Sequence, residues 1–347
     1  MWALAPHARI SAAASLTAAP KKEPLLSASA MRRLSGRPRA ILTASLVVLI
    51  AASLLAAAAA PRSSEAARSG RRCAYCGEPI DGAYMEQGGK LYHKTCWEEH
   101  VALRCSLCGR IIQGSYVKDS WGNLYHTSHR KETAECEYCG RFISEKVTGG
   151  GVRYADGRNV CNICRRTAVD GEGTGRRLLA EAASRLAGIG VKVDPSRVRL
   201  QLVDVDLMGK LSGDRSRLRT GYTQYEWESS SEGKRRSESV TVDVLIGMPR
   251  IETIATMAHE LTHVWLSREG RFETEPALAE GSCNYAAVRV LEGYSGPEAA
   301  HLIVKMKGSE DPVYGEGLRR VIRFADRNGA PAWLQLVRSR DDFPRGF

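Results

Sequence analysis

The feature that most constrains this chain is a threefold repeat of paired metal-ligand residues between residues 73 and 164. Each copy begins with C-x-x-C-G, and the copies start 32 and then 31 residues apart. Each ends with a second pair of Cys or His separated by two residues. A period of this length is typical of stacked copies of one supersecondary unit. The paired residues are Cys73, Cys76, His93 and Cys96 in the first unit, Cys105, Cys108, His126 and His129 in the second, and Cys136, Cys139, Cys161 and Cys164 in the third.

These pairs have the composition of structural zinc sites. Four Cys or His ligands are what a closed tetrahedral zinc site requires. The glycine after the second Cys of each unit (Gly77, Gly109 and Gly140) supplies the backbone freedom that a tight ligand turn needs. A region so poor in aliphatic residues would depend on metal binding for its folding free energy. A disulfide framework is the alternative in an exported chain, but three His at regular ligand positions favour three structural zinc ions.

The first 60 residues have the pattern of an export leader. Residues 1–72 contain eleven Lys and Arg and two acidic residues, so they carry 11 − 2 = +9 of the formal net charge of +11. An uncharged run from Ala40 to Ala60 grades into alanines that end before Pro61. Basic, apolar and small-residue segments in this order are typical of a signal peptide, and a start at Met31 would make it well formed. The run is also long enough to act as a signal anchor.

The leader predicts where the rest of the chain is located. Positive charge on the N-terminal side of the apolar run predicts an exported body, secreted or periplasmic after cleavage, or held as a single-pass membrane protein. Only 11 − 9 = +2 remains for the residues after 72, so the body lacks the basic surface that nucleic-acid binding needs. We therefore expect no nucleic-acid partner, and contact with a membrane only through the N-terminal segment.

After the leader, the sequence divides into a polar linker at 61–72, the zinc-binding region at 73–167 and a globular domain at 168–347. Residues 176–188 show helical periodicity, whereas 198–205 and 240–246 are strand-like. The last domain is expected to be α+β, with a small antiparallel sheet over 197–246 in which 226–239 form a solvated hairpin connection. We expect its later helices at 250–267, 276–291, 297–307 and 316–327.

The pentapeptide HELTH lies in the first of these later helices. A spacing of four places His259 and His263 one turn apart on the same face, so both imidazoles can bind one zinc ion. Glu260 lies beside them, where it can take a proton from a metal-bound water whose pKa zinc lowers towards 7. The strand-like run just upstream is expected to border the cleft and to pair with an extended peptide substrate.

A hydrolytic zinc site needs a third protein ligand and an open fourth position. Glu280, on the helix after HELTH, is the favoured third ligand, and Glu273 and Glu275 are alternatives in the loop or helix start before it. Cys283 lies one turn beyond Glu280 and is expected to be a buried, inert thiol. The small Gly281 is expected to let this helix approach the HELTH helix closely.

The zinc-binding region resembles a LIM domain, whose zinc units share the pattern C-x₂-C…H-x₂-C. The eight residues between Cys96 and Cys105 form a longer spacer than LIM domains have. Because LIM-type modules generally bind proteins, the resemblance implies a docking or bracing role for this region.

The chain as a whole is similar to the ubiquitin-activated LIM peptidases that restrict organ growth in plants. The similarity covers roughly residues 73–340 and rests on ADGRNVCNIC, GMPR, AHELTHVWL, AEGSCN and YGEGL. It implies a gluzincin-like peptidase domain with His259 and His263 as zinc ligands, Glu260 as general base and Glu280 as the acidic third ligand. Tyr314 would either stabilise an oxyanion or serve packing. The family's ubiquitin-interacting helices are not visible here and the chain instead has an export signal, so control by ubiquitin is not carried over from the resemblance.

We therefore predict a zinc-dependent endopeptidase with one catalytic and about three structural zinc ions. Its substrate is expected to be a protein or peptide, and the LIM-like region is expected to bind a protein partner. The alternative is a non-catalytic, zinc-stabilised scaffold for protein interactions. The presence of Glu260 favours the enzyme, since a scaffold would be free to lose it.

Overall fold

The computed structural model describes residues 10–14, 70–213, 219–229, 235–271 and 274–347. Apart from residues 10–14, the predicted leader lies outside the described residues. Within the described part of the chain, none of the helices is both long and apolar enough to cross a membrane. The described residues fall into two compact units, a smaller one of residues 70–117 and 124–127 and a larger one of residues 10–14, 118–123 and 128–347.

The smaller unit is built from short hairpins that carry the four ligands of the first zinc unit and Cys105, Cys108 and His126 of the second. Strands β2 (Tyr84–Gln87) and β3 (Lys90–His93) are antiparallel and lead into a short helix, α1 (Lys94–Cys96), and a π-helical turn (Trp97–Val101). Strands β4 (Tyr116–Lys118) and β5 (Leu124–His126) repeat the hairpin. Apart from cysteines, the buried core of the first hairpin consists of Ile80 and Tyr92. So small a core supports the expectation that folding here depends on metal.

The third zinc unit belongs to the larger compact unit. Helix α2 (His129–Glu132), which begins with the last ligand of the second unit, precedes it, and its own elements are α3 (Glu145–Thr148), β6 (Gly151–Arg153), β7 (Asn159–Cys161), α4 (Asn162–Arg165) and β8 (Ala168–Val169). Its buried cysteines, Tyr138 and Val160 are part of the same hydrophobic core as the helices and sheet that follow. The sequence changes character at residue 168, but the two compact units do not divide there.

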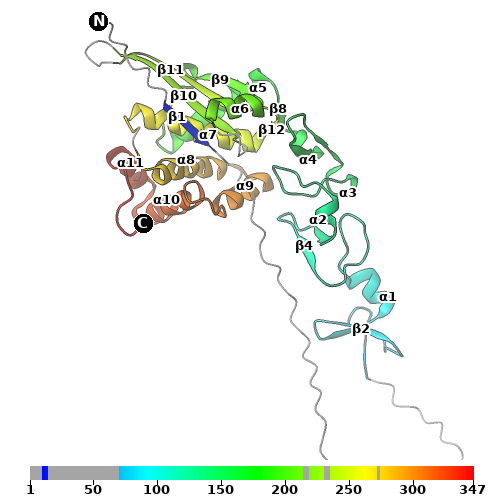
Figure 1. Cartoon of the computed structure of the whole chain (residues 1–347). Coiled ribbons are helices and arrows are strands. Elements are labelled where there is room, and N and C mark those ends of the chain that lie inside the picture. The colour runs from blue at the N-terminus through cyan, green and yellow to red at the C-terminus, as the bar shows by residue number, and fades with distance from the viewer. Residues whose placement is uncertain (1–9, 15–69, 214–218, 230–234, 272–273) are drawn as a thin grey trace, which may run out of the picture. The chain divides into compact units, whose positions relative to one another are not determined.

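A four-stranded sheet lies on one side of the larger unit, in the order β1-β10-β11-β9 (Figure 1). These strands are β1 (Ile10–Ala14), β9 (Arg199–Val203), β10 (Gly221–Ser229) and β11 (Arg235–Leu245). Strands β1, β10 and β11 pair antiparallel, but β9 runs parallel to β11. The predicted antiparallel sheet is therefore wrong in this respect, because β9 is joined to the other strands by a crossover rather than by a hairpin.

Two further predictions about the sheet are wrong. Of the residues 226–239, expected as a solvated hairpin connection, 226–229 and 235–239 instead extend β10 and β11, with Glu226 paired to Ser239 and Ser229 to Arg235, and 230–234 lie outside the described residues. Strand β11 was expected to pair with a substrate, but it lies between β10 and β9 and has no free edge.

Helices form the rest of the larger unit. They are α5 (Glu172–Gly188), α6 (Val205–Ser212), α7 (Arg250–Arg268), α8 (Pro276–Leu291), α9 (Pro297–Lys307), α10 (Gly315–Asn328) and α11 (Ala330–Ser339). The predicted helices at 250–267, 276–291, 297–307 and 316–327 are confirmed, whereas α6 and α11 were missed. A 3-10 turn (Pro195–Arg197) precedes β9.

Helix α7 runs through the centre of this unit. It packs against α5, α8 and the sheet, and every residue from Glu252 to Ser267 is buried (Figure 1). At its start, β12 (Met248–Pro249) pairs antiparallel with β8, and the Arg250 amide donates to the Thr167 carbonyl at 2.8 Å. The end of the third zinc unit is thus hydrogen-bonded to the start of the helix that carries HELTH. A helix buried on all sides holds its polar residues in fixed positions.

Candidate metal centres

Helices α7 and α8 bring three predicted ligands together. The Nε2 atoms of His259 and His263 lie 3.1 Å apart, and Oε2 of Glu280 lies 3.0 Å from the first and 3.3 Å from the second. A tetrahedral zinc ion with bonds of roughly 2.0–2.1 Å keeps such ligand atoms about 3.3 Å apart. The three side chains therefore fit one zinc ion, and little of each is exposed to solvent, from 0% for His259 to 13% for Glu280.

The orientation of His259 is fixed by a residue that the sequence did not reveal. Oδ1 of Asn284 lies 2.9 Å from Nδ1 of His259, and an amide oxygen can only accept, so Nδ1 donates and Nε2 keeps its lone pair for a metal. Nδ2 of Asn284 donates to the Tyr314 carbonyl at 3.1 Å. The only signal in the sequence is position: Asn284 follows Glu280 by four residues and so shares its face of α8.

Glu260 is fully buried, and its two carboxylate oxygens have different surroundings. Oε2 accepts a hydrogen bond of 2.6 Å from the Thr223 hydroxyl. Among the described residues, Oε1 has no hydrogen-bond partner. Burial raises the pKa of Glu260 to about 8, and the nearby imidazole of His259 opposes the shift. The second oxygen is thus available to a water or substrate group.

The backbone of a glycine, Gly221, lies against the Glu260 carboxylate. A Cβ placed on Gly221, at the start of β10, would come within 2.5 Å of Oε1 and 2.8 Å of Cγ of Glu260. Only glycine can therefore occupy this position without displacing Glu260.

Two residues of α8 face the imidazole pair. Burial would raise the pKa of Glu280, but the two imidazoles hold it at about 2, so its carboxylate is ionised. Cys283 is also buried and groups with His259 and His263, with ligand atoms within 4.8 Å of one another. Burial, together with the charge on Glu280, raises the pKa of the Cys283 thiol well above its usual range. Of the alternatives, Glu275 instead caps α8 by accepting from the Leu278 amide at 2.8 Å, and Glu273 lies outside the described residues.

The small Gly281 of α8 was predicted to contact α7, but it contacts α10. A Cβ on Gly281 would overlap the backbone of Gly317 in α10, and a Cβ on Gly317 would overlap the backbone of Ala277. Gly281 therefore permits close approach of α10, rather than of α7. This contact places Tyr314, at the start of α10, with its ring 6.3 Å from the His259 ring and tilted by 28°.

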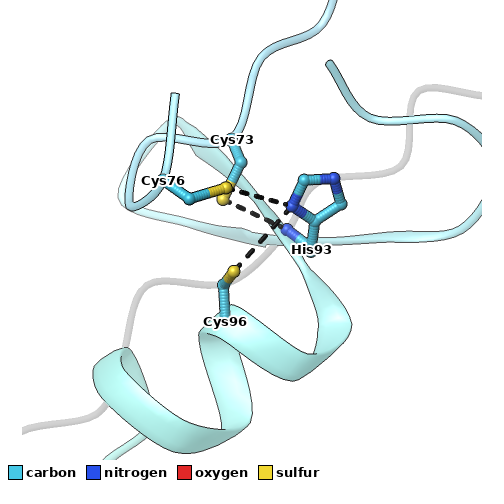
Figure 2. Close-up of side chains that lie close together, drawn as sticks. All are labelled: Cys73, Cys76, His93 and Cys96. Atoms are coloured by element: carbon cyan, nitrogen blue, oxygen red, sulfur yellow. Dashed lines mark hydrogen bonds between the residues drawn. The ribbon is translucent and has the colours of Figure 1, made fainter. Parts of the chain in front are cut away.

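The first zinc unit has the geometry of a tetrahedral site (Figure 2). The Nδ1 atom of His93 lies 3.4 Å from Sγ of Cys76 and 3.8 Å from Sγ of Cys96. Zinc bonds of roughly 2.3 Å to sulfur and 2.0–2.1 Å to nitrogen give an edge of about 3.5 Å. Nε2 of His93 lies 3.0 Å from the Pro79 carbonyl, which can only accept, so Nδ1 is left as the ligand atom.

The other two units repeat this arrangement. In the second, Nδ1 of His126 lies 3.4 Å from Sγ of Cys108, and Nε2 lies 3.2 Å from the Ile111 carbonyl. In the third, the sulfurs of Cys139 and Cys161 are 3.7 Å apart, close to the roughly 3.8 Å edge of a zinc site and far beyond a disulfide bond. All ten cysteines are free thiols. The four ligands of each unit group together as predicted.

The turn predicted after each first ligand pair is also present. The amides of Gly77, Gly109 and Gly140 donate to the carbonyls of Cys73, Cys105 and Cys136 at 2.8–2.9 Å. All three glycines have positive φ angles, of 78°, 75° and 69°. Only glycine adopts these values routinely, so the C-x-x-C-G signature follows from the backbone of the turn.

Comparisons with known proteins found several plant proteins of similar sequence. Residues 214–301 match the family model described as DA1-like, Protein DA1. The chain is 27% identical to Protein DA1-related 2 of Arabidopsis thaliana over 262 residues, which cover 64% of this chain and 48% of that protein. It is 25% identical to LIM domain-containing protein HDR3 of Oryza sativa subsp. japonica over 259 residues (64% and 51%), and 24% identical to Protein DA1 of Arabidopsis thaliana over 340 residues (79% and 63%).

These similarities make the chain a distant relative of the plant DA1 and DA1-related proteins. The matched part of the chain spans about half the length of the first two relatives and less than two thirds of the third. No solved structure matches the chain.

Proposed function

We propose that this chain is a zinc-dependent endopeptidase whose catalytic zinc is held by His259, His263 and Glu280. One observation carries the proposal: two imidazole nitrogens and a carboxylate oxygen converge within 3.0–3.3 Å beside a buried Glu260. The relationship to the DA1-like family supports the same chemistry. Glu280 is preferred to Cys283 because its carboxylate is ionised and touches both imidazoles, whereas the raised thiol pKa disfavours the thiolate that zinc binds.

Zinc bound there would supply a Lewis acid that polarises the scissile carbonyl and lowers the pKa of water. The protein's own groups handle the proton. Oε1 of Glu260 takes the proton of the attacking water, while the hydrogen bond from Thr223 holds Oε2 in place. Glu260 then gives the proton to the leaving amine. Burial of this carboxylate keeps bulk water from competing for the proton.

We propose that the other three clusters hold structural zinc ions. Each presents four Cys or His ligands and leaves no open position for substrate, as closed sites do. The LIM-like region is then a protein-docking element rather than a second active site.

The predicted leader supports a further proposal, that the body is exported. Cleavage before Pro61 would also remove β1, the neighbour of β10 in the sheet. Because β10 begins beside Glu260, its exposed edge would then be available to an extended peptide substrate. The N-terminal sequence of the mature protein tests this. A chain that retains residues 1–60 and is found in the cytoplasm would contradict it.

Cleavage of an unfolded protein substrate tests the proposed activity. Fluorescein-labelled casein is incubated with wild type, with Glu260→Gln, and with Glu298→Gln, which changes an exposed Glu on α9 and serves as the matched control. Wild type and Glu298→Gln are expected to cleave casein, and Glu260→Gln to lose about 10²-fold or more in rate. Metal analysis should find about four zinc ions per chain and one fewer in His259→Ala. Equal cleavage by all three proteins would remove the mechanism, and absence of zinc would remove the metal sites.

A further inference from the structure

The residues at the start of β10 lie beside the candidate active site. Thr220 is anchored twice: its carbonyl accepts a hydrogen bond from the Leu245 amide at 2.9 Å, and its side-chain hydroxyl accepts one from the Thr256 hydroxyl at 3.2 Å. The next residue, Gly221, lies against the Glu260 carboxylate. Arg219 directly precedes this anchored pair, so its backbone is held at the same end of the strand.

The backbone of Tyr314, at the start of α10, is also held by hydrogen bonds. Oδ1 of Asp311 accepts from the amides of Val313 and Tyr314, each at 2.9 Å, and Asn284 donates to the Tyr314 carbonyl. Asn284 is also the residue that orients His259. One side chain thus fixes both the imidazole and the backbone of the tyrosine beside it.

The side chains of Arg219 and Tyr314 hydrogen-bond to each other. A guanidinium has donors and no acceptor, so Arg219 donates to the phenol oxygen, and the phenol's own proton must point elsewhere. Nε and Nη1 of Arg219 are shielded from solvent, where the cation acts more strongly on its neighbours. A tyrosine phenol has an ordinary pKa of about 10, so it keeps its proton at neutral pH.

We propose that Arg219 is a positioning residue that orients and polarises the Tyr314 hydroxyl as a hydrogen-bond donor to the substrate's carbonyl oxygen. The inference rests on the proposed peptidase function. As water adds to the peptide carbon, negative charge develops on that oxygen, and a donor already in place stabilises it. No bond within Tyr314 or Arg219 breaks. The guanidinium strengthens the donor by occupying and polarising the phenol oxygen.

An alternative role for the same cation makes a different prediction. A guanidinium at the rim of the site could bind a carboxylate of the substrate directly, without Tyr314. Removal of Arg219 would then raise KM for acidic substrates and act independently of Tyr314. The positioning role instead lowers kcat and acts only when the phenol is present.

Steady-state kinetics on a fluorescence-quenched peptide, designed around a casein bond that wild type cleaves, separate these roles. Tyr314→Phe is expected to lower kcat by about 10²–10³-fold with little change in KM, as for loss of one oxyanion donor. Arg219→Met is expected to lower kcat by about 10-fold, and Arg219→Lys to restore part of that loss. In the Tyr314→Phe background, Arg219→Met should have no further effect. Arg197→Met, at an exposed position, is the matched control.

The outcomes distinguish the inference from the function on which it rests. Thermal denaturation and zinc content should match wild type in all variants used. If Glu260→Gln abolishes cleavage but Arg219→Met lowers kcat equally with and without Tyr314, the positioning role is wrong and the peptidase stands. A rise in KM alone would assign Arg219 to substrate binding and overturn the inference. If wild type and Glu260→Gln cleave alike, the proposed function itself fails.

Discussion

The contact between α8 and α10 gives a sharp prediction, because both helices use glycine where they meet. A Cβ on Gly317 would overlap the carbonyl of Ala277, and the opposing atoms are backbone rather than the end of a flexible side chain. Gly317→Ala must therefore push the helices apart. Overpacking of this kind costs about 1–3 kcal/mol. For a domain of this size, each kcal/mol lowers Tm by about 2–4 °C, so we expect a loss of about 2–12 °C.

The same change should reduce activity by more than instability alone. Gly317 lies in the first turn of α10, and Tyr314 is the residue directly before that helix. The Tyr314 carbonyl accepts the hydrogen bond from Asn284. Displacing α10 disturbs this hydrogen bond and with it the orientation of His259. A misplacement of about 1 Å in a catalytic group can cost up to about 10²-fold in rate. We expect kcat to fall by about 10-fold at a temperature where the variant is fully folded.

Thermal denaturation and casein cleavage, measured on the same preparations, check both effects. The matched control is Gly173→Ala in α5, where an added Cβ meets only the end of the Arg177 side chain at 3.9 Å. This control should raise stability, by up to about 1 kcal/mol, because alanine is the better helix former. If Gly317→Ala is as stable and as active as wild type, the close approach of α8 and α10 is not a feature of the folded protein.

Two further predictions concern the third zinc unit and the sheet. Cys161→Ser should remove one zinc ion. We expect a loss of about 3 kcal/mol of stability, a modest part of the ~10–16 kcal/mol that zinc supplies to zinc fingers. At about 2–4 °C per kcal/mol, this lowers the main Tm by about 6–12 °C. Cys76→Ser, in the smaller compact unit, should remove one zinc ion and leave that transition unchanged. Burial raises the pKa of Asp243, so above its unfolded pKa of about 3.9 the native state binds more protons than the unfolded chain. Stability should therefore fall as pH rises through that window, and Asp243→Asn should flatten the dependence in Tm measurements from about pH 4 to 8.

Features encoded within one helix or one turn were predictable from the sequence. Pro276 and Pro297 stand at the first positions of α8 and α9, where the missing amide hydrogen costs nothing. The spacing of His259 and His263 fixes their shared face by helix geometry alone. The glycine after each first ligand pair likewise marks a turn that needs positive φ. In each case the signal lies within a few residues of the structure that it predicts.

Features that depend on distant partners could not be predicted in this way. The parallel pairing of β9 with β11 joins segments separated by α6 and β10. Gly281 looks the same in sequence whether it faces α7 or α10, and only the folded chain shows that Gly317 is its neighbour. The role of Asn284 requires the imidazole of another helix. A single sequence carries the residue types for these contacts but not the identity of the partners.

The three zinc units, alike in sequence, differ in what surrounds them, and this difference bears on their roles. In the first, Cys76 is exposed and the buried hydrophobic core is only Cys73, Ile80 and Tyr92. In the third, all four ligands are buried and share a core with α7 and α8. Lys305 of α9 connects the third zinc unit to α7. Its Nζ lies 3.5 Å from the Tyr138 carbonyl in that unit and 3.8 Å from Oε1 of the buried Glu252 in α7. A docking role therefore suits the first unit, whereas the third is placed to brace the helix that carries the candidate catalytic site.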